Sequence, residues 1–296
     1  MEIQWYPGHM AKAKRQIKEV LKVIDAVLEL VDARAPESSH IPDIKEIVEE
    51  KPIIRVLNKE DLAEKNVTEN WIKYFKNQGI TSFSVDSIHK DGIKSIIDYL
   101  RKIKKQKNSV VRCIVMGVPN VGKSSFINQM AGRKGAKTGD IPGITKGKMW
   151  LKVNEDLELL DTPGILWPKF DEKEVGIKLA ILGCIKEEIY DAEKIALILI
   201  DFLIFKAKEE LMKRFKLDTL GTPEEILEKI GEKRGCLLPG GKIDALKAAK
   251  IVLKEYREGR IGRISLEEPE NKGFWEKFKN NIEAEEEGYL YEGYQG

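Results

Sequence analysis

Short apolar runs, many of them β-branched, recur through the first half of the chain, and each ends in a polar turn. Runs of this length are typical of buried strands, whereas apolar residues three and four positions apart indicate amphipathic helices. The expected strands are 25–31, 52–57, 81–85, 110–115, 149–153 and 157–160, the last two forming a hairpin. Helical patterns lie at 17–24, 41–49, 71–78, 92–105 and after 123. This alternation predicts an α/β fold with a doubly wound sheet.

Beyond about residue 170 the patterns are helical, and no strand is evident. Helices are expected over 174–189, 191–215 and 243–257, and a capped helix start at Thr222-Pro223-Glu224-Glu225. The apolar side of the helix over 243–257 is assigned to Ile243, Leu246, Ala249, Ile251 and Leu253. We therefore predict an α/β domain over 1–170 that begins with a basic helix, a small all-α domain over 171–282, and an acidic tail over 283–296.

Charge and cysteine content narrow the class of protein. The 296 residues include 51 basic and 49 acidic side chains, so a nucleic-acid surface would have to be a local patch. The three cysteines lie far apart, which argues against a disulfide framework and a local zinc site. The longest apolar run, 195–205, contains Asp201 and is too short to cross a bilayer. We expect a cytoplasmic monomer without a membrane span.

A complete phosphate-binding motif, G-x-x-x-x-G-K-[ST], lies at 117–124, between a predicted strand and a predicted helix. In this context the backbone N–H groups of the loop and the helix N-terminus bind phosphate oxygens. Lys123 should reach the β- and γ-phosphates, and the Ser124 hydroxyl should hold Mg²⁺. The expected phosphate-binding residues are Pro119, Asn120, Val121, Gly122, Lys123, Ser124 and Ser125.

A second motif, N-K-x-D, follows directly after the strand predicted over 52–57. The Asp61 carboxylate can accept hydrogen bonds from the N1–H and N2–H groups of guanine, and Asn58 can bind its O6/N7 side, next to Lys59. Adenine has an acceptor in place of N1–H, so the site should select guanine. The turn Asp86-Ser87-Ile88 lies where such a domain supports the base, although its sequence is weakly specific.

Two further motifs follow the phosphate loop. Thr145, in the Gly- and Lys-rich segment 135–148, could close onto Mg²⁺ and the γ-phosphate as a switch does, although an ordinary flexible loop is the alternative. Asp161 opens a D-x-x-G motif at the end of the second hairpin strand, where it would hold Mg²⁺, with the Gly164 N–H sensing the γ-phosphate.

The order of these motifs is unusual, because N-K-x-D precedes the phosphate loop by about sixty residues. Ordinary small GTPases have the phosphate loop first. The spacings still suit a doubly wound sheet, so a circular permutation is the simplest explanation, with the old termini joined through 104–109. The helical part then follows the second switch directly, and we expect the nucleotide state to set its pose.

The combined motifs resemble the circularly permuted GTPases of the YlqF/RbgA ribosome-assembly family. Besides the motifs above, the resemblance is carried by Trp5-Tyr6-Pro7-Gly8-His9-Met10, Asp32-Ala33-Arg34-x-Pro36, Pro142-Gly143-x-Thr145 and Leu238-Pro239-Gly240-Gly241-x-x-Asp244. It implies GTP hydrolysis to GDP during late maturation of the bacterial 50S subunit, and a helical C-terminal domain that contacts ribosomal RNA.

The group that orients the attacking water is left open by the sequence. Many GTPases have Gln just after D-x-x-G, but this chain has Ile165, so slow intrinsic turnover is expected. His9 is one candidate, to which the family resemblance points; its alternative is to order the Pro7-Gly8 turn. A second candidate is K⁺ bound by Asn120, as in related GTPases. A third is a group supplied by the assembling ribosome.

Two basic stretches are candidate RNA surfaces, although solvated charged faces are the usual meaning of helical lysines. They comprise Lys14, Arg15, Lys18 and Lys22 near the start, and Lys247, Lys250, Lys254 and Arg257 near the end. Three rival functions remain: a GTPase acting on another, tRNA-related RNA, a nucleotide-gated RNA-binding protein with negligible turnover, and a metabolic kinase. The complete guanine and switch motifs argue against the kinase.

Overall fold

The computed structural model describes residues 17–42, 44–86, 91–103, 110–132, 136–138, 150–161, 173–270, 273–276 and 278. Within them, one seven-stranded sheet has the order β3-β2-β1-β4-β7-β6-β5. The strands from β3 to β7 in this order are parallel, and β6 and β5 are antiparallel additions. The strands are β1 Ala26–Asp32, β2 Ile53–Asn58, β3 Thr81–Val85, β4 Val111–Gly117, β5 Ala136–Thr138, β6 Trp150–Asn154 and β7 Leu157–Asp161. The six expected strands are confirmed. Strand β5 was not expected, and it lies in the segment 135–148, for which a switch loop was predicted.

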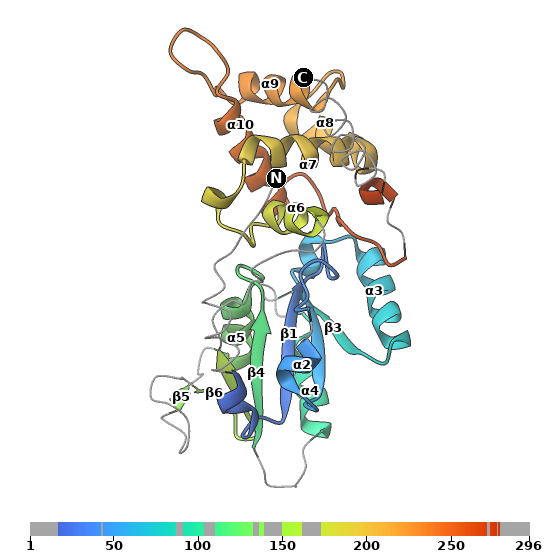
Figure 1. Cartoon of the computed structure of the whole chain (residues 1–296), viewed down its shortest axis with the longest axis vertical. Helices are drawn as coiled ribbons and strands as arrows, with labels where there is room; N and C mark the ends of the chain where they lie inside the picture. The colour runs from blue at the N-terminus through green and yellow to red at the C-terminus, as the bar shows by residue number, and fades with distance from the viewer. Residues whose placement is uncertain are drawn as a thin grey trace, which may run out of the picture.

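Helices cover both faces of the sheet, which confirms the doubly wound arrangement (Figure 1). Alternate residues of the strands point to opposite faces. Val27 packs with the predicted N-terminal stripe and with α2, whereas Leu28 belongs to the core that contains α4 and α5. The stripe is buried as expected and consists of Ile17, Val20, Leu21 and Ile24. The elements are α2 Ile44–Val48, the 3₁₀ turn η1 Glu60–Leu62, α3 Lys65–Asn77, α4 Ile93–Lys102 and α5 Lys123–Ala131.

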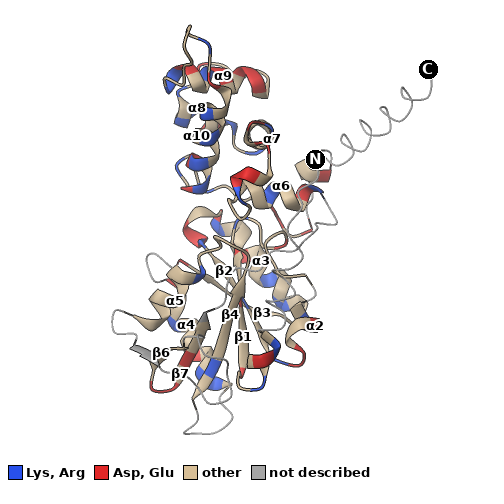
Figure 2. Cartoon of the chain, turned by 60° about the vertical axis from the view of Figure 1, so that its left-hand side comes forward, with Lys and Arg blue, Asp and Glu red and all other residues tan. Residues whose placement is uncertain are grey.

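The named elements between residues 173 and 257 are all helical, and they lie beyond the carboxyl ends of the parallel strands (Figure 1). They are α6 Lys173–Ile181, the 3₁₀ turn η2 Glu187–Ile189, α7 Ala192–Lys206, α8 Lys208–Phe215, α9 Pro223–Lys233 and α10 Ala245–Arg257. The predicted cap of α9 is present: Thr222 Oγ1 accepts from Glu225 N, and the Glu225 carboxylate accepts from Thr222 N. We call residues 173–270 the helical region. Its charges of both signs are interspersed (Figure 2).

Two helix predictions in this region were wrong. The helix expected over 174–189 ends at Ile181, because the chain turns at Gly183, whose φ of +75° is a left-handed conformation that favours glycine. The helix expected over 191–215 divides at Ala207, whose backbone is not helical.

The predicted apolar side of α10 was also partly wrong. The side chains that pack inward are Ala248, Ala249, Val252, Leu253 and Tyr256. They repeat at the helical spacing toward α7 and α9, whereas Leu246 points outward and is 44% exposed.

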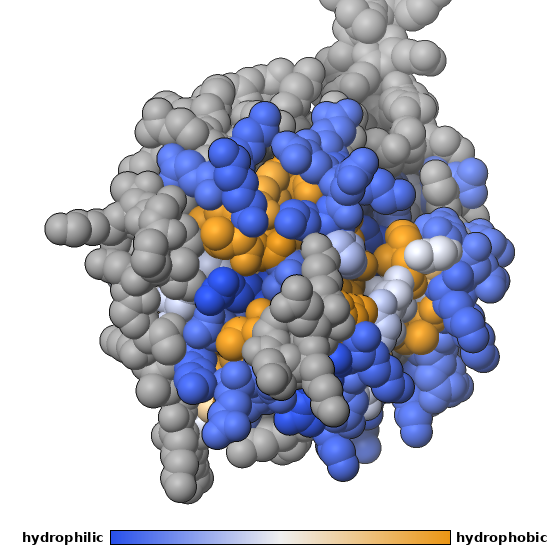
Figure 3. Space-filling view, turned by 90° about the horizontal axis from the view of Figure 1, so that it is seen from below, coloured by the Kyte–Doolittle hydropathy of each residue, from blue (hydrophilic) through white to orange (hydrophobic). Residues whose placement is uncertain are grey.

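Cys113, Cys184 and Cys236 are buried, free thiols. None of the described helices has both the length and the apolar character needed to cross a bilayer. Seen from the end of the sheet opposite the helical region, apolar side chains lie in patches among hydrophilic ones (Figure 3).

Candidate nucleotide-binding site

The phosphate loop has the predicted strand–loop–helix geometry. Strand β4 ends at Gly117 and α5 begins at Lys123, with Gly122 as the N-cap in a left-handed conformation. The Lys123 ammonium donates to the Gly117 carbonyl at 3.2 Å and to the Val118 carbonyl at 2.9 Å, and its side chain is buried. Ser124 and Ser125 are exposed in the first turn of α5. The ammonium therefore lies under the loop, and the helix N-terminus faces the site where an anion would bind.

The guanine motif and the phosphate loop hold each other, although 59 residues separate Asn58 from Gly117 in the sequence. Asn58 Nδ2 donates to the Val121 carbonyl at 2.9 Å, and Lys59 Nζ donates to the Asn120 carbonyl at 2.9 Å. A side chain at Gly122 would place Cβ 2.3 Å from Asn58 Nδ2, so only glycine permits this close approach. The two motifs thus form one site at the carboxyl ends of β2 and β4.

The rest of the predicted base pocket is only partly described. Asp61 lies in η1, half-buried, and Asp86 follows β3 as a buried residue whose N–H donates to the Asp91 carbonyl. Strands β2 and β3 are adjacent, which places the two carboxylates along the same edge of the sheet. Several predicted residues lie outside the described residues: His9, Lys14, Arg15, Ser87, Ile88, Thr145 and Gly164.

Two of the three residues predicted to hold Mg²⁺ have a described backbone position. Ser124 lies at the start of α5, and Asp161 ends β7 in register with Val115 of β4. Hydroxyl and carboxylate oxygens are the ligands that Mg²⁺ prefers. The side chain of Asp161 lies outside the described part. Within that part, no three His, Cys, Asp or Glu side chains cluster as a further metal site.

A buried charge cluster beside this site was not predicted as functional. Asp32, at the end of β1, is fully buried and accepts from Arg34 Nε at 2.9 Å, Arg34 Nη2 at 2.8 Å and Lys59 Nζ at 3.0 Å. Burial by itself would raise the pKa of the Asp32 carboxyl, but the charges and hydrogen bonds of Arg34 and Lys59 hold that pKa below its usual range. In the sequence, the segment Asp32-Ala33-Arg34 marks this cluster, but it was used only as part of the family resemblance.

Arg34 also connects the sheet to the helical region. Its Nη1 donates to the carbonyls of Tyr256 at 3.2 Å and Arg257 at 3.4 Å, at the C-terminal end of α10. The guanidinium lies 5.2 Å from the centre of the Tyr256 ring. A cation at this end of a helix also complements the helix dipole. Arg34 therefore joins the Asp32 carboxylate, and through it Lys59, to the last turn of α10.

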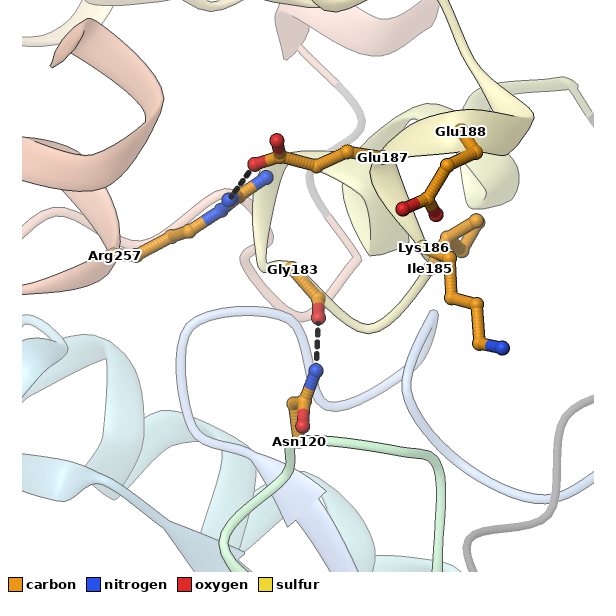
Figure 4. Close-up of a pocket in the computed structure, with 7 residues that line it drawn as sticks. All are labelled: Asn120, Gly183, Ile185, Lys186, Glu187, Glu188 and Arg257. Atoms are coloured by element: carbon orange, nitrogen blue, oxygen red, sulfur yellow. Dashed lines mark hydrogen bonds and ion pairs between the residues drawn. The ribbon is translucent and has the colours of Figure 1, made fainter. Parts of the chain in front are cut away.

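A second connection leads directly from the phosphate loop (Figure 4). Asn120 has a left-handed backbone, and its Nδ2 donates to the Gly183 carbonyl at 2.7 Å. The two residues border a pocket of about 520 Å³ whose other lining residues are Ile185, Lys186, Glu187, Glu188 and Arg257. The loop that would bind phosphate thus contacts the first turn after α6.

Arg257, predicted as an RNA contact, has a different place. Its guanidinium donates to the carbonyls of Ala180 and Ile181 and to the Tyr190 hydroxyl, and it pairs with Glu187 at 3.2 Å. These contacts fix α10 to the end of α6. This guanidinium is therefore already engaged within the protein, and its contact with RNA stays a prediction.

The other predicted basic residues that are described lie on the surface. Lys18 and Lys22 are exposed on the N-terminal helix, away from its buried stripe. Lys247, Lys250 and Lys254 are exposed on α10, where Lys250 lies 3.7 Å from Glu187 and Lys254 4.0 Å from Glu258. Exposed pairs at these distances contribute little to stability, so the lysines remain available for other contacts.

Comparisons with known proteins show the family of this chain. A family model described as "50S ribosome-binding GTPase" matches residues 112–233, and one described as "RsgA GTPase" matches residues 44–171. Ribosome biogenesis GTPase A of Priestia megaterium is 46% identical over 283 residues, covering 91% of this chain and 98% of its own. The Thermotoga maritima protein of that name is 34% identical over 269 residues, covering 91% and 95%. The crystal structure of GNP-bound YlqF from T. maritima superposes with a TM-score of 0.65 at 29% identity, covering 88% of this chain and 99% of that one.

The fold and the joined motifs define a P-loop GTPase whose guanine motif precedes its phosphate loop, as in a circularly permuted domain. The two relatives named above align with this chain over 98% and 95% of their own length. The chain belongs to the ribosome biogenesis GTPase A family.

Proposed function

We propose that this GTPase binds GTP between its two motifs, hydrolyses it slowly alone and faster on a maturing bacterial 50S subunit, and contacts ribosomal RNA through its helical region. We place it in the cytoplasm as a monomer. The observation that carries the proposal is the pair of hydrogen bonds from Asn58 and Lys59 to the phosphate loop, which joins the predicted guanine motif and the phosphate loop in one place. The names of the relatives support the ribosomal role.

The predicted site residues suit this chemistry. Lys123 already lies beneath the loop, so its ammonium can exchange the carbonyls of Gly117 and Val118 for β- and γ-phosphate oxygens. Ser124, Thr145 and Asp161 would hold Mg²⁺, which neutralises the charge that develops on the phosphates. The Gly164 N–H would sense the γ-phosphate. Asp61 would read the base, with Asp86, Ser87 and Ile88 beside it.

Three candidates are proposed for the group that orients the attacking water. His9 would accept a proton from the attacking water near neutral pH. Asn120 would bind K⁺ through its side-chain oxygen, while its Nδ2 donates to the Gly183 carbonyl. A ribosomal group would complete the site in trans, which would make turnover depend on the correct particle.

Two contacts support a coupling between the nucleotide and the pose of the helical region. One runs from Asn120 to Gly183, and the other from Lys59 through Asp32 and Arg34 to the end of α10. Both begin at residues that would touch or border the nucleotide. A change in the phosphate loop can therefore alter two attachment points of the helical region at once.

The proposed function is tested by measuring hydrolysis of GTP and of ATP by the purified protein, with and without immature large subunits. The expected result is a slow GTP-specific rate that rises on addition of the particles. Equal rates with ATP and GTP would refute the base site. A GTP-specific rate that responds to tRNA-related RNA and not to ribosomal particles would favour the rival RNA target, and binding without turnover would favour a nucleotide-gated binding protein.

A further inference from the structure

The connection between α9 and α10 is a tight hairpin-like turn at the end of the molecule farthest from the sheet (Figures 1 and 2). Leu237 and Ile243 form an antiparallel bridge, and Leu238 N donates to the Lys242 carbonyl at 2.8 Å. Gly240 and Gly241 have φ of +89° and +80°, which favour glycine. We call residues 237–247 the tip.

Most of the large apolar side chains that the described residues expose lie in the tip. Four large hydrophobic side chains stand out as exposed in the described residues, and three of them belong to the tip. They are Leu237 at 55%, Leu238 at 47% and Leu246 at 44%; the fourth is Phe205 at 58%. Single exposed leucines are ordinary, but a local group on an ordered turn indicates a surface that becomes covered.

The two glycines of the tip determine its backbone conformation and leave its outer surface without side chains. A Cβ built at Gly240 or Gly241 would meet no atom within 4 Å, so no packing contact requires glycine there. Their role is therefore conformational, and the bare turn leaves its backbone open to a partner that approaches closely.

The charged residues that follow this apolar group in the sequence are mostly basic. From 237 to 254 the sequence has four lysines and one acidic residue, Asp244. The Asp244 carboxylate is engaged, because it caps α10 by accepting from Lys247 N at 2.9 Å. The exposed lysines 247, 250 and 254 follow one another at helical spacing, so a basic stripe continues from the tip along one side of α10.

We infer that the tip is an RNA-docking wedge: Leu237 and Leu238 pack against unstacked bases of an RNA loop or bulge, while Lys242 and the α10 lysines bind its phosphates. Apolar wedges flanked by cationic side chains are used on nucleic acids, and RNA offers its unpaired bases for such contacts. Lysine is depleted at the centre of protein–protein interfaces, which disfavours a protein partner for a patch so rich in it. The inference rests on the proposed RNA contact and specifies its site and chemistry.

The location of the tip fits this role. Asn120, which belongs to the phosphate loop, contacts the helical region at Gly183, beside Arg257 at the C-terminal end of α10, whereas the tip lies at the opposite end of α10. Docking of the tip would therefore leave the nucleotide site accessible.

The test is binding of the full chain to purified, protein-free large-subunit ribosomal RNA over a range of salt concentrations. The double variant Leu237→Ser/Leu238→Ser removes two exposed side chains, so folding and basal GTP hydrolysis should be unchanged. We expect about a tenfold loss of RNA affinity with the same salt dependence, because only apolar contacts are removed. Lys247→Ala/Lys250→Ala should instead lower the salt slope by about one to two. Phe205→Ser, equally exposed but outside the tip, is the matched control and should bind as the wild type does.

The outcomes separate the alternatives. Wild-type affinity in the leucine variant would overturn the wedge while leaving the basic stripe as the RNA contact. Normal affinity for protein-free RNA with weakened binding to the intact particle would assign the tip to a protein partner, which also overturns the inference. If the unmodified protein bound no ribosomal RNA at all, the proposed RNA contact itself would fail, together with the wedge.

Discussion

Arg34 should be one of the most sensitive positions for stability, and Arg34→Met is the perturbation that shows it. In the wild type, three hydrogen bonds of 2.8–3.0 Å from cations neutralise the fully buried Asp32, two from Arg34 and one from Lys59. The variant leaves only Lys59 and removes a donor from two carbonyls at the end of α10. Breaking a buried ion pair costs about 3–5 kcal/mol. Because Lys59 remains, we expect about 3 kcal/mol.

The free energy of unfolding of both proteins is measured by chemical denaturation. Arg101→Met is the matched control, since Arg101 is about half exposed and pairs with Asp98 at only 3.4 Å. That variant should stay within about 1 kcal/mol of the wild type. The double variant Asp32→Asn/Arg34→Met should recover part of the loss, because no uncompensated carboxylate then remains buried.

The difference in the free energy of unfolding between the wild type and Arg34→Met should depend on pH. In the wild type the pKa of Asp32 is lowered, so its contribution is present above its unfolded pKa of about 3.9 and is lost as pH falls toward the folded value. In Arg34→Met the raising effect of burial is opposed by Lys59 and by the backbone N–H of residue 34, without the Arg34 charge, so the pKa of Asp32 should rise. The difference in stability should be largest at neutral pH and shrink as the solution is acidified. A loss at neutral pH no larger than that of Arg101→Met would refute the reasoning.

Three further predictions concern the nucleotide site. Asp61→Asn should weaken GTP binding and favour xanthosine triphosphate, measured by nucleotide competition, because the base then offers an acceptor to the amide; retained preference for GTP would overturn the base assignment. His9→Ala should bind GTP normally but lose the stimulation by large subunits in a turnover assay, and unchanged stimulation would remove His9 from the mechanism. Asn120→Ala should lose any dependence of the rate on K⁺ and should loosen the contact at Gly183, seen as faster amide exchange after α6; a rate that responds to K⁺ as before would exclude Asn120 as a cation ligand.

The sequence predicted the sheet well because its signals are local. Each parallel strand is a short apolar run ended by a turn, and the phosphate loop carries its strand and helix with it. The guanine motif could be assigned from four residues, and the structure places Asn58 and Lys59 against the phosphate loop. The switch residues and His9 lie outside the described residues and stay predictions.

What the sequence did not reveal depends on long-range contacts. Gly183 ends α6 through a left-handed turn, but nothing nearby in the sequence distinguishes it from a glycine within a helix. Arg257 looked like one more cation of a basic helix, yet its partners are carbonyls some 76 residues earlier. Arg34 likewise reaches α10 across 222 residues. Periodicity indicates which face of a helix is buried, but not which polar group will be bonded there.

A distance measurement can show whether the nucleotide state is transmitted to the helical region. Cysteines introduced at the exposed positions Asn128 of α5 and Glu228 of α9 can carry spin labels, because the three native cysteines are buried. The distance between the labels should differ between the GDP form and a form with a non-hydrolysable GTP analogue. The difference should diminish when Asn120→Ala removes one of the two connections. Identical distances in both nucleotide states, on and off the large subunit, would contradict the account.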